Sequence, residues 1–221
     1  MSPKTHEPSV QTLIPSTRKK TPARSGSAHS ILRNRTLSGA TRSRAVCMFP
    51  KVQATVEDSR AVAEIYVRSR QAAWRDVMDP TYLDALDVEG EERSFWSLLA
   101  PADQDWRVLI AEDDRILGFV SFRLEPDGER VGHVGALYVA PDRFGSGVGT
   151  ALLGAAADEL RNEGATTAFL WVLAHDTRTI SFYEARGWLQ DGARMTLELD
   201  QPRVAVRCTK TLIGSSAVEP T

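Results

Sequence analysis

A glycine-rich turn between a strand-like and a helix-like segment is the feature that most restricts how this chain can fold. Residues 131–139 show the pattern of a strand, a proline-led loop follows, and a helical pattern then runs to Gly164. Gly145, Gly147 and Gly149 occupy alternate positions where that helix begins. Backbone N–H groups at a helix N-terminus attract phosphate through unpaired donors and the positive end of the helix dipole. The segment therefore predicts either an anion site or a tight turn without a ligand.

Two common nucleotide-binding motifs do not fit this turn. A dinucleotide fingerprint needs an acidic residue about 20 positions further on, at the end of a second strand. The chain has Ala165 there, within an expected turn. A P-loop needs a Gly-Lys pair, and the sequence contains none.

The 221-residue chain has room for one ordinary domain, and its charge is divided between two regions. Residues 1–47 carry a net charge of +8, whereas the remaining residues carry −10. No apolar run of about 18 residues occurs, so a transmembrane span is excluded. Two distant cysteines and four histidines do not form the spacing of a disulfide framework or a metal site, so we expect no metal.

Residues 1–47 form a basic segment that is too poor in apolar residues to order itself. Three interpretations are open: an arm that binds nucleic acid or an anionic membrane, an organelle transit peptide, or an over-extended start before Met48. We favour the last. No secretory signal is present, so we expect a cytoplasmic protein with a domain at residues 48–212 and a C-terminal tail at 213–221.

The residue patterns within the domain predict alternating strands and helices. An alternating strand through Val56 leads to a capping box at Thr55 and Asp58. A helix then runs to Trp74, and Pro80 breaks it. We expect a second helix at residues 88–99, a turn at 126–128, and strands at 106–111, 116–124, 131–139, 169–173, 194–199 and 203–210, the first two joined as a hairpin.

The turn and a second motif together resemble the GNAT superfamily of acetyl-CoA-dependent N-acetyltransferases. In that family a strand ending in Leu-Tyr-Val, here Leu137-Tyr138-Val139, leads to Gln/Arg-x-x-Gly-x-Gly/Ala, here residues 144–149 with Phe144 in the Gln/Arg place. Residues 175–188 match the second motif, with Asp176 at its Asn position. The resemblance covers residues 50–210. It implies an α/β (α+β) fold with a mixed, mainly antiparallel sheet of six to seven strands flanked by about four helices.

The resemblance implies an enzyme that moves acetyl from acetyl-CoA to a primary amine of a small molecule or protein, by direct attack in a ternary complex. Leu137, Tyr138 and Val139 would pair with the pantetheine, and the Val139 N–H would stabilise the oxyanion. Asp176, which can also cap its helix, stands at a cofactor-binding position. The segment expected to bind the pyrophosphate comprises Phe144, Gly145, Ser146, Gly147, Val148, Gly149 and Thr150.

Two residues are expected to move protons. Tyr183 stands at the family's general-acid position, and we favour this role over packing because its neighbour Phe182 should face another way on the helix. His133 stands where many members carry a Glu base, and its ordinary pKa of about 6.5 suits that task. Two alternatives stay open. In one, His133 is only an exposed strand residue and a water chain takes the proton; in the other, Glu112 at the hairpin end is the base. His175 is expected to be a loop residue.

The acceptor amine is expected to contact the first two helices, through Trp74 and Met78 near Asp76 and Tyr82, and the loop 200–202. An aromatic wall with a nearby acid suits a cationic amine, although core and rim positions would show the same residue types. The sequence leaves a homodimer open and predicts no nucleic-acid or membrane partner for the domain. A degenerate module that binds acyl-CoA as a sensor or partner is the alternative function, because Phe144, Asp176 and His133 depart from the family pattern.

Overall fold

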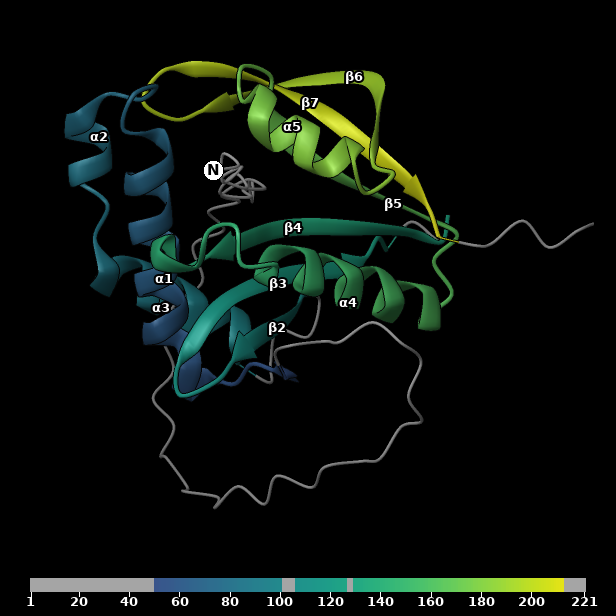
Figure 1. The fold of residues 1–221 in the computed structure, drawn as a ribbon, viewed down its shortest axis with the longest axis horizontal. Coiled ribbons are helices and arrows are strands. Elements are labelled where there is room, and N and C mark those ends of the chain that lie inside the picture. The colour runs from purple at the N-terminus through teal and green to yellow at the C-terminus, as the bar shows by residue number, and fades with distance from the viewer. Residues whose placement is uncertain (1–49, 101–105, 127–128, 213–221) are drawn as a thin grey trace, which may run out of the picture.

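The chain is built around one mixed sheet in the computed structural model, which describes residues 50–100, 106–126 and 129–212 (Figure 1). Within these residues the sheet has seven strands in the order β1-β2-β3-β4-β5-β7-β6. Neighbouring strands are antiparallel except β4 and β5, which are parallel. The strands are β1 (Lys51–Gln53), β2 (Arg107–Glu112), β3 (Ile116–Leu124), β4 (Val131–Val139), β5 (Thr167–Leu173), β6 (Leu189–Glu198) and β7 (Pro202–Thr211). The predicted sheet is confirmed.

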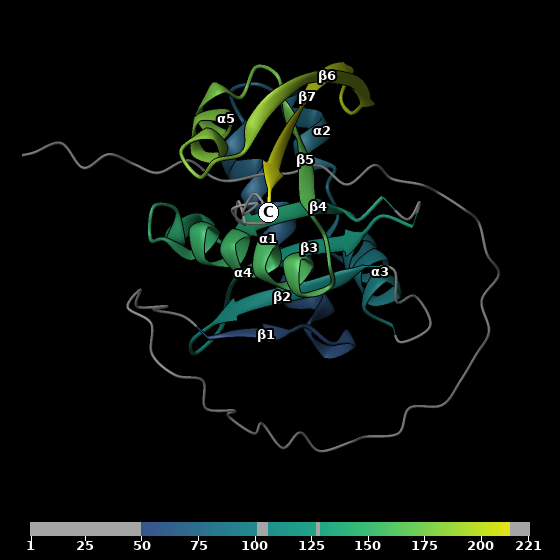
Figure 2. The ribbon, with the colours of Figure 1, turned by 90° about the vertical axis from the view of Figure 1, so that its right-hand side faces the viewer.

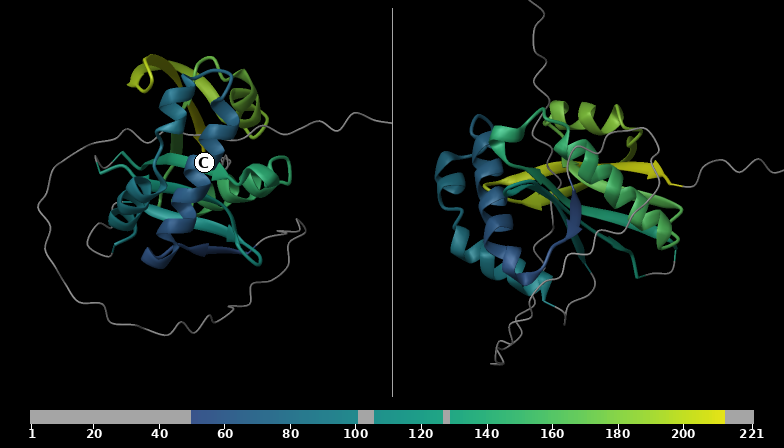
Figure 3. Two further views of the ribbon diagram at one scale, coloured as in Figure 1. Left: turned by 90° about the vertical axis from the view of Figure 1, so that its left-hand side faces the viewer. Right: turned by 60° about the horizontal axis from the view of Figure 1, so that its bottom comes forward.

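Five α-helices of the described residues flank this sheet: α1 (Ser59–Trp74), α2 (Pro80–Asp84), α3 (Val88–Leu99), α4 (Val148–Asn162) and α5 (Thr177–Glu184). Helices α1 and α3 cover one face over β2 to β4, and α4 covers the opposite face (Figure 2). Helix α5 packs on the same side as α4, whereas α2 lies beside the β6–β7 end of the sheet (Figure 3). The sequence predicted about four helices, and the described part of the structure has one more, the short helix α2.

Two local expectations at the start of the domain need correction. The predicted capping box is present, because the Thr55 N–H donates to the Asp58 carboxylate over 2.8 Å. It caps a 3₁₀ turn at Val56–Asp58, so the first strand ends at Gln53 instead of reaching Val56. Pro80 does not break the first helix, because that helix already ends at Trp74. Pro80 instead begins α2, where the N–H that proline lacks would have no acceptor within the helix.

Several sequence expectations lie outside the described residues. They are the basic segment 1–47, Met48, the C-terminal tail 213–221, and residues 127–128 of the expected turn at 126–128. In the described part of the chain, no helix is both long and apolar enough to cross a membrane.

Strand β4 changes its pairing in the middle. Ser121 of β3 lies opposite Ala136, but the next residue, Phe122, lies opposite Val134, so Gly135 is the extra residue of a β-bulge. On its other side β4 pairs with β5 only through residues 131–134. Beyond Val134 the two strands diverge toward α1 and α2 (Figure 1). The sheet is therefore opened along the second half of β4.

The close approach of β3 and β4 generates a first prediction, because Gly118 leaves no room for a side chain. A Cβ atom on Gly118 would lie 2.7 Å from the Tyr138 carbonyl oxygen and 3.2 Å from the Val139 Cα. Since backbone atoms cannot move aside cheaply, we expect Gly118→Ala to lower the free energy of unfolding by about 1–3 kcal/mol. Urea denaturation of the full chain measures this change.

Gly154→Ala is the matched control for this prediction. Gly154 lies exposed within α4, and a Cβ atom there would meet nothing within 4 Å. Alanine should raise the free energy of unfolding by about 0.5–1 kcal/mol through its helix propensity. An unchanged midpoint for Gly118→Ala beside a raised one for Gly154→Ala would contradict the described spacing of β3 and β4.

Candidate active site

The second half of β4 presents backbone groups to the side from which β5 has diverged. The Ala140 N–H donates to the Leu117 carbonyl of the preceding strand over 2.8 Å. In an antiparallel ladder the backbone groups of alternate residues point to the same neighbour, so Tyr138 also faces β3. Leu137 and Val139 consequently face away from β3. The Val139 carbonyl accepts from the Ser69 hydroxyl over 2.6 Å, which leaves the Val139 N–H and both Leu137 groups along this edge.

Tyr138 is the exception among the three residues predicted to pair with pantetheine. Its ring packs against Tyr66 and Phe119 beneath α1, with centroid separations of 4.9 and 5.5 Å. Burial raises the pKa of Tyr138 well above its ordinary value, so the phenol stays neutral. Tyr138 thus supports the strand from the α1 face, while its backbone is directed at β3.

The glycine-rich turn brings residues 144–150 together at the N-terminus of α4. Gly145 and Gly147 have φ angles of +80° and +86°, a region that favours glycine. Gly147 is the N-cap of α4, and an α-helix leaves its first N–H groups without intrahelical acceptors. A Cβ atom on Gly147 would meet nothing within 4 Å, so the turn is open on that side. Phe144, half-buried, packs against the core behind it.

Two cations beside this turn were missed by the sequence analysis. Arg186 donates from Nε and Nη2 to the Thr150 hydroxyl over 3.0 and 2.7 Å. Lys210 donates to the Arg186 carbonyl over 2.7 Å. With Leu153 and Trp188, among others, these residues line a cavity of about 250 Å³ next to the start of α4. Neither motif marks Arg186 or Lys210, because only the folded chain brings α5 and β7 to the turn.

Tyr183 and Phe182 are both buried, with 0% and 4% of their surfaces exposed. The expectation that these two adjacent helix residues could not both belong to the core to the same degree is therefore wrong. The reason is Arg186, whose guanidinium carbon lies 3.7 Å from the Phe182 ring centroid and covers it. Tyr183 belongs to the core between α5 and the sheet, and its catalytic role stays a prediction.

Asp176 caps α5, as the sequence allowed. One carboxylate oxygen accepts the Thr179 N–H over 2.9 Å, and the other accepts the Thr179 hydroxyl over 2.8 Å. Both oxygens are thus engaged with the first turn of the helix. His175, immediately before it, is an exposed loop residue as expected.

His133 is buried on β4, so the alternative of an exposed strand histidine is wrong. Only 5% of its surface is exposed, because Phe169 stacks on the ring at 4.3 Å and Trp106 meets it edge-on at 5.2 Å. Its Nδ1 lies 3.0 Å from Oε1 of Glu125. Burial lowers the pKa of His133 and the Arg123 charge adds to this, while Glu125 acts in the opposite direction.

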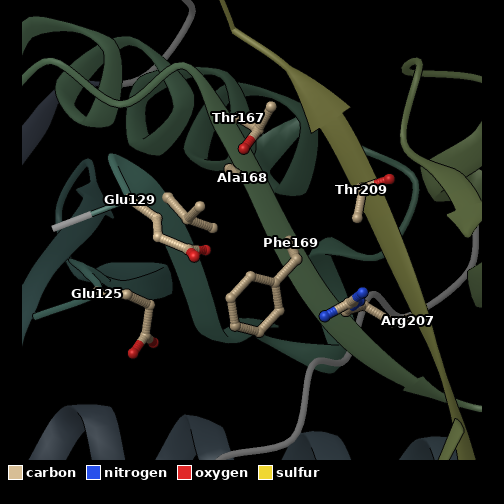
Figure 4. A pocket seen from close by; sticks show the side chains of 8 residues that line it. Glu125, Glu129, Thr167, Ala168, Phe169, Arg207 and Thr209 are labelled. Carbon is tan, nitrogen blue, oxygen red and sulfur yellow. The ribbon is translucent and has the colours of Figure 1, made fainter. Parts of the chain in front are cut away.

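Glu125, the hydrogen-bond partner of His133, lines a cavity of about 400 Å³ at the start of β4 and β5 (Figure 4). Its lining includes Glu125, Glu129, Phe169 and Arg207. No sequence motif marks Glu125, because only the register of β3 against β4 brings it to the histidine. Glu112, the other candidate base, lies at the opposite end of β3, paired with Ile116.

Trp74 and Met78, predicted to contact the acceptor, are buried with 2% and 4% of their surfaces exposed. They pack with Leu83, Leu173 and Leu197 where α1 and α2 meet the sheet. Trp74 also lines a cavity of about 330 Å³ that includes Phe144 and Asp176. A role in acceptor binding stays a prediction for both residues.

The two regions expected to form the acceptor wall do come together. The Asp200 carboxylate, in the loop between β6 and β7, accepts the Asp79 N–H over 3.0 Å. Arg203 pairs with Asp200 and also donates to the Val77 carbonyl over 2.7 Å. These contacts join the last loop of the sheet to the segment before α2.

Comparison with known proteins gives a consistent result. Residues 60–188 match the Acetyltransferase (GNAT) family. YuaI of Bacillus subtilis strain 168, an uncharacterized N-acetyltransferase, is 29% identical over 138 residues, which cover 60% of this chain and 76% of YuaI. The mycothiol acetyltransferase of Kocuria rhizophila is 33% identical over 110 residues, covering 46% of this chain and 34% of that protein.

The fold is also similar to solved structures. PaiA N-acetyltransferase from Thermoplasma acidophilum, solved in complex with coenzyme A, superimposes with a TM-score of 0.62 at 16% sequence identity. The match covers 74% of this chain and 98% of that protein, so the likeness extends over nearly the whole of the solved domain.

The cap on α5 generates a prediction for stability. Asp176→Ala removes the acceptor for the Thr179 N–H, and we expect the free energy of unfolding to fall by about 1 kcal/mol. Asp176→Asn keeps an amide oxygen for this N–H and should lose less. Asp87→Ala is a matched control, because Asp87 caps α3 through the Gly90 N–H at 2.9 Å. Urea denaturation should give similar losses for the two alanine variants; no loss at Asp176 would contradict its role as a cap.

Proposed function

The chain belongs to the GNAT family of acetyltransferases and is an acyltransferase, and we propose that it transfers acetyl from acetyl-CoA to a primary amine. The amine belongs to a small molecule or a protein, and it attacks directly in a ternary complex. The observation that carries this proposal is the open edge of β4, where Leu137 and Val139 face away from β3 next to the glycine-rich turn.

The geometry supports distinct roles for the two ends of this edge. A pantetheine chain carries amides, and the Leu137 N–H and C=O would pair with them as a strand does. The pyrophosphate would meet the N–H groups at the start of α4, between Gly145 and Thr150. Arg186 and Lys210 add fixed positive charge beside that turn, which favours an anionic ligand.

Acetyl transfer also needs a stabilised oxyanion and two proton transfers. We assign the oxyanion to the Val139 N–H, which the register directs away from β3. An alkyl ammonium with a pKa near 10 must lose a proton before it attacks, and His133 is the proposed base. Tyr183 is the proposed acid for the departing thiolate.

A second candidate is a module that binds acyl-CoA without turnover. The full burial of Tyr183 favours it, because a buried phenol is also an ordinary core residue. Phe144 favours it too, because its side chain offers no hydrogen bond to a phosphate. The two candidates share the coenzyme and differ in turnover, so they require separate tests.

Binding of the coenzyme is the first of these tests. We expect acetyl-CoA at 100 times its Kd to stabilise the full chain by about 2.7 kcal/mol, which thermal unfolding detects as a raised midpoint. NADH, whose fingerprint the chain lacks, should leave the midpoint unchanged.

Two glycine variants make this test specific. Gly147 and Gly164 both have positive φ angles, +86° and +93°, and a Cβ atom at either would meet nothing within 4 Å. Alanine should therefore cost about 1 kcal/mol of backbone strain at either position. Only Gly147→Ala should lose the response to acetyl-CoA. An equal response in both variants would contradict coenzyme binding at the turn.

Turnover is tested with Tyr183→Phe in a screen of amines that records released thiol. If Tyr183 protonates the thiolate, we expect kcat to fall about tenfold or more while the Kd for acetyl-CoA stays the same. Because phenylalanine fills nearly the same volume, the fold should be retained. Unchanged kcat would leave Tyr183 a core residue, and no thiol release from the wild type with any amine would favour the binding module.

A further inference from the structure

We propose that Glu125 is a positioning residue. It orients the His133 ring so that the lone pair on Nε2 of His133 can accept a proton from the acceptor amine, and Arg123 in turn holds Glu125 in place. This inference rests on the acetyl transfer proposed above and specifies how its base is built. The base is then a hydrogen-bonded pair, and the carboxylate that completes it directly follows the neighbouring strand β3.

The contact between Glu125 and His133 determines which nitrogen carries the proton. Nδ1 of His133 lies 3.0 Å from Oε1 of Glu125. An ionised carboxylate only accepts hydrogen bonds, so Nδ1 must be the donor. In a neutral imidazole the other nitrogen then carries the lone pair. Glu125 therefore selects Nε2 as the atom that accepts a proton.

Glu125 is itself fixed from two directions. Arg123 donates from Nε and Nη2 to the two carboxylate oxygens over 3.1 and 3.0 Å. The Glu125 N–H donates to the Val131 carbonyl over 2.8 Å, which anchors the backbone to the start of β4. The carboxylate is thus held in one orientation toward His133.

The ring of His133 is also fixed in its plane. Phe169 stacks on it with an interplanar angle of 19°, and Trp106 meets it edge-on at 60°. Arg123 lies over the Trp106 ring at 4.7 Å, so the same guanidinium supports both the carboxylate and the aromatic wall. A base held this firmly loses little entropy when it accepts a proton.

The Nε2 atom of His133 and the hydroxyl of Ser121 are both buried and have no hydrogen-bond partner in the described part of the chain. An unsatisfied buried polar atom costs stability, and such an atom in a native protein calls for an explanation. Both atoms flank the β4 bulge. The Ser121 hydroxyl would lie 3.3 Å from a Cβ on Gly135, and Trp106 packs on both Gly135 and His133.

The bulge lies where β4 leaves β5, so these two polar atoms adjoin the place where the sheet opens. An acceptor that enters there meets a lone pair on Nε2. The ammonium gives one proton to Nε2, and the neutral amine attacks the thioester carbonyl. The C–N bond forms, the C–S bond breaks, the Tyr183 hydroxyl gives its proton to the thiolate, and the second amine proton restores the phenol. The imidazolium then releases its proton to solvent.

The charges around His133 set the pH range in which this base is neutral. They are Arg123 on β3 and Glu125 directly after it. Glu129 lines the same cavity as Glu125, and the Arg207 guanidinium carbon, on β7, lies 5.7 Å from the Phe169 ring centroid. Burial lowers the pKa of His133 and Arg123 lowers it further, whereas Glu125 raises it. Removal of Glu125 and removal of Arg123 should therefore move the pKa in opposite directions.

Steady-state kinetics of the full chain over a range of pH test this inference. In Glu125→Gln we expect kcat to fall about tenfold or more at neutral pH, with the KM for acetyl-CoA unchanged. The acidic limb of kcat/KM for the amine should move to lower pH, because the carboxylate that raises the His133 pKa is gone. In Arg123→Gln that limb should move to higher pH. General damage to the fold would not shift the limb in opposite directions.

Glu159→Gln is the matched control, because it removes a carboxylate that pairs with Arg107 over 2.6 Å on the other face of the sheet. Its pH profile should equal that of the wild type. Wild-type profiles in both Glu125→Gln and Arg123→Gln, in an enzyme that releases thiol, would overturn the positioning role.

A spectroscopic readout separates this inference from the proposed function. The chain has four histidines, so ¹⁵N-labelled imidazole signals can be assigned with a His133→Gln variant. We expect a protonated Nδ1 and an unprotonated Nε2 at neutral pH, and loss of this preference in Glu125→Ala. A protonated Nε2 in the wild type would overturn the inference. The expected tautomer in a chain that acetylates no amine would contradict the acetyl transfer alone.

Discussion

The divergence of β4 from β5 after Val134 is the constraint on which the rest of the site depends. A strand inside a sheet has both rows of backbone groups paired, and it offers nothing to a ligand. Here one row of β4 is paired with β3 along its length, while the other row loses its neighbour halfway. The bulge at Gly135 lies at that transition, and bulges bend a strand and re-aim its side chains. Packing of α1 against the far end, through Ser69 and Val139, keeps the opening in place.

This opening also separates two electrostatic environments along a single strand. At the end of β4 the chain passes into a helix N-terminus with Arg186 beside it, which suits a strongly anionic group. At the beginning of β4 His133 is enclosed by aromatic rings, and burial lowers its pKa. A polyanion and a neutral base would disturb each other if they were adjacent, because negative charge raises the pKa of an imidazole. The intervening part of β4 would keep two such groups apart.

The sequence predicted what is local, and much of the fold is local. The strands, the glycine-rich turn and the helix after Asp176 follow from patterns within a few residues, and all are present. The short helix at Pro80 was missed because proline signals a helix start as well as a break. Glu125, Arg186 and Lys210 could not be found in this way. Their contacts depend on strand register and on how α5 and β7 pack beside α4, which no single segment encodes.

The departure at Phe144 shows how such non-local contacts change the interpretation of a motif. Taken alone, replacing Gln or Arg by Phe removes a side-chain donor from the turn, which argues against binding of an anion. In the structure Phe144 packs against the core, and Arg186 is tied to Thr150 in the first turn of α4. A positive charge is thus present beside the turn, although it comes from the turn that follows α5. The local charge of a binding site is a property of the packed molecule, and a motif read residue by residue underestimates it.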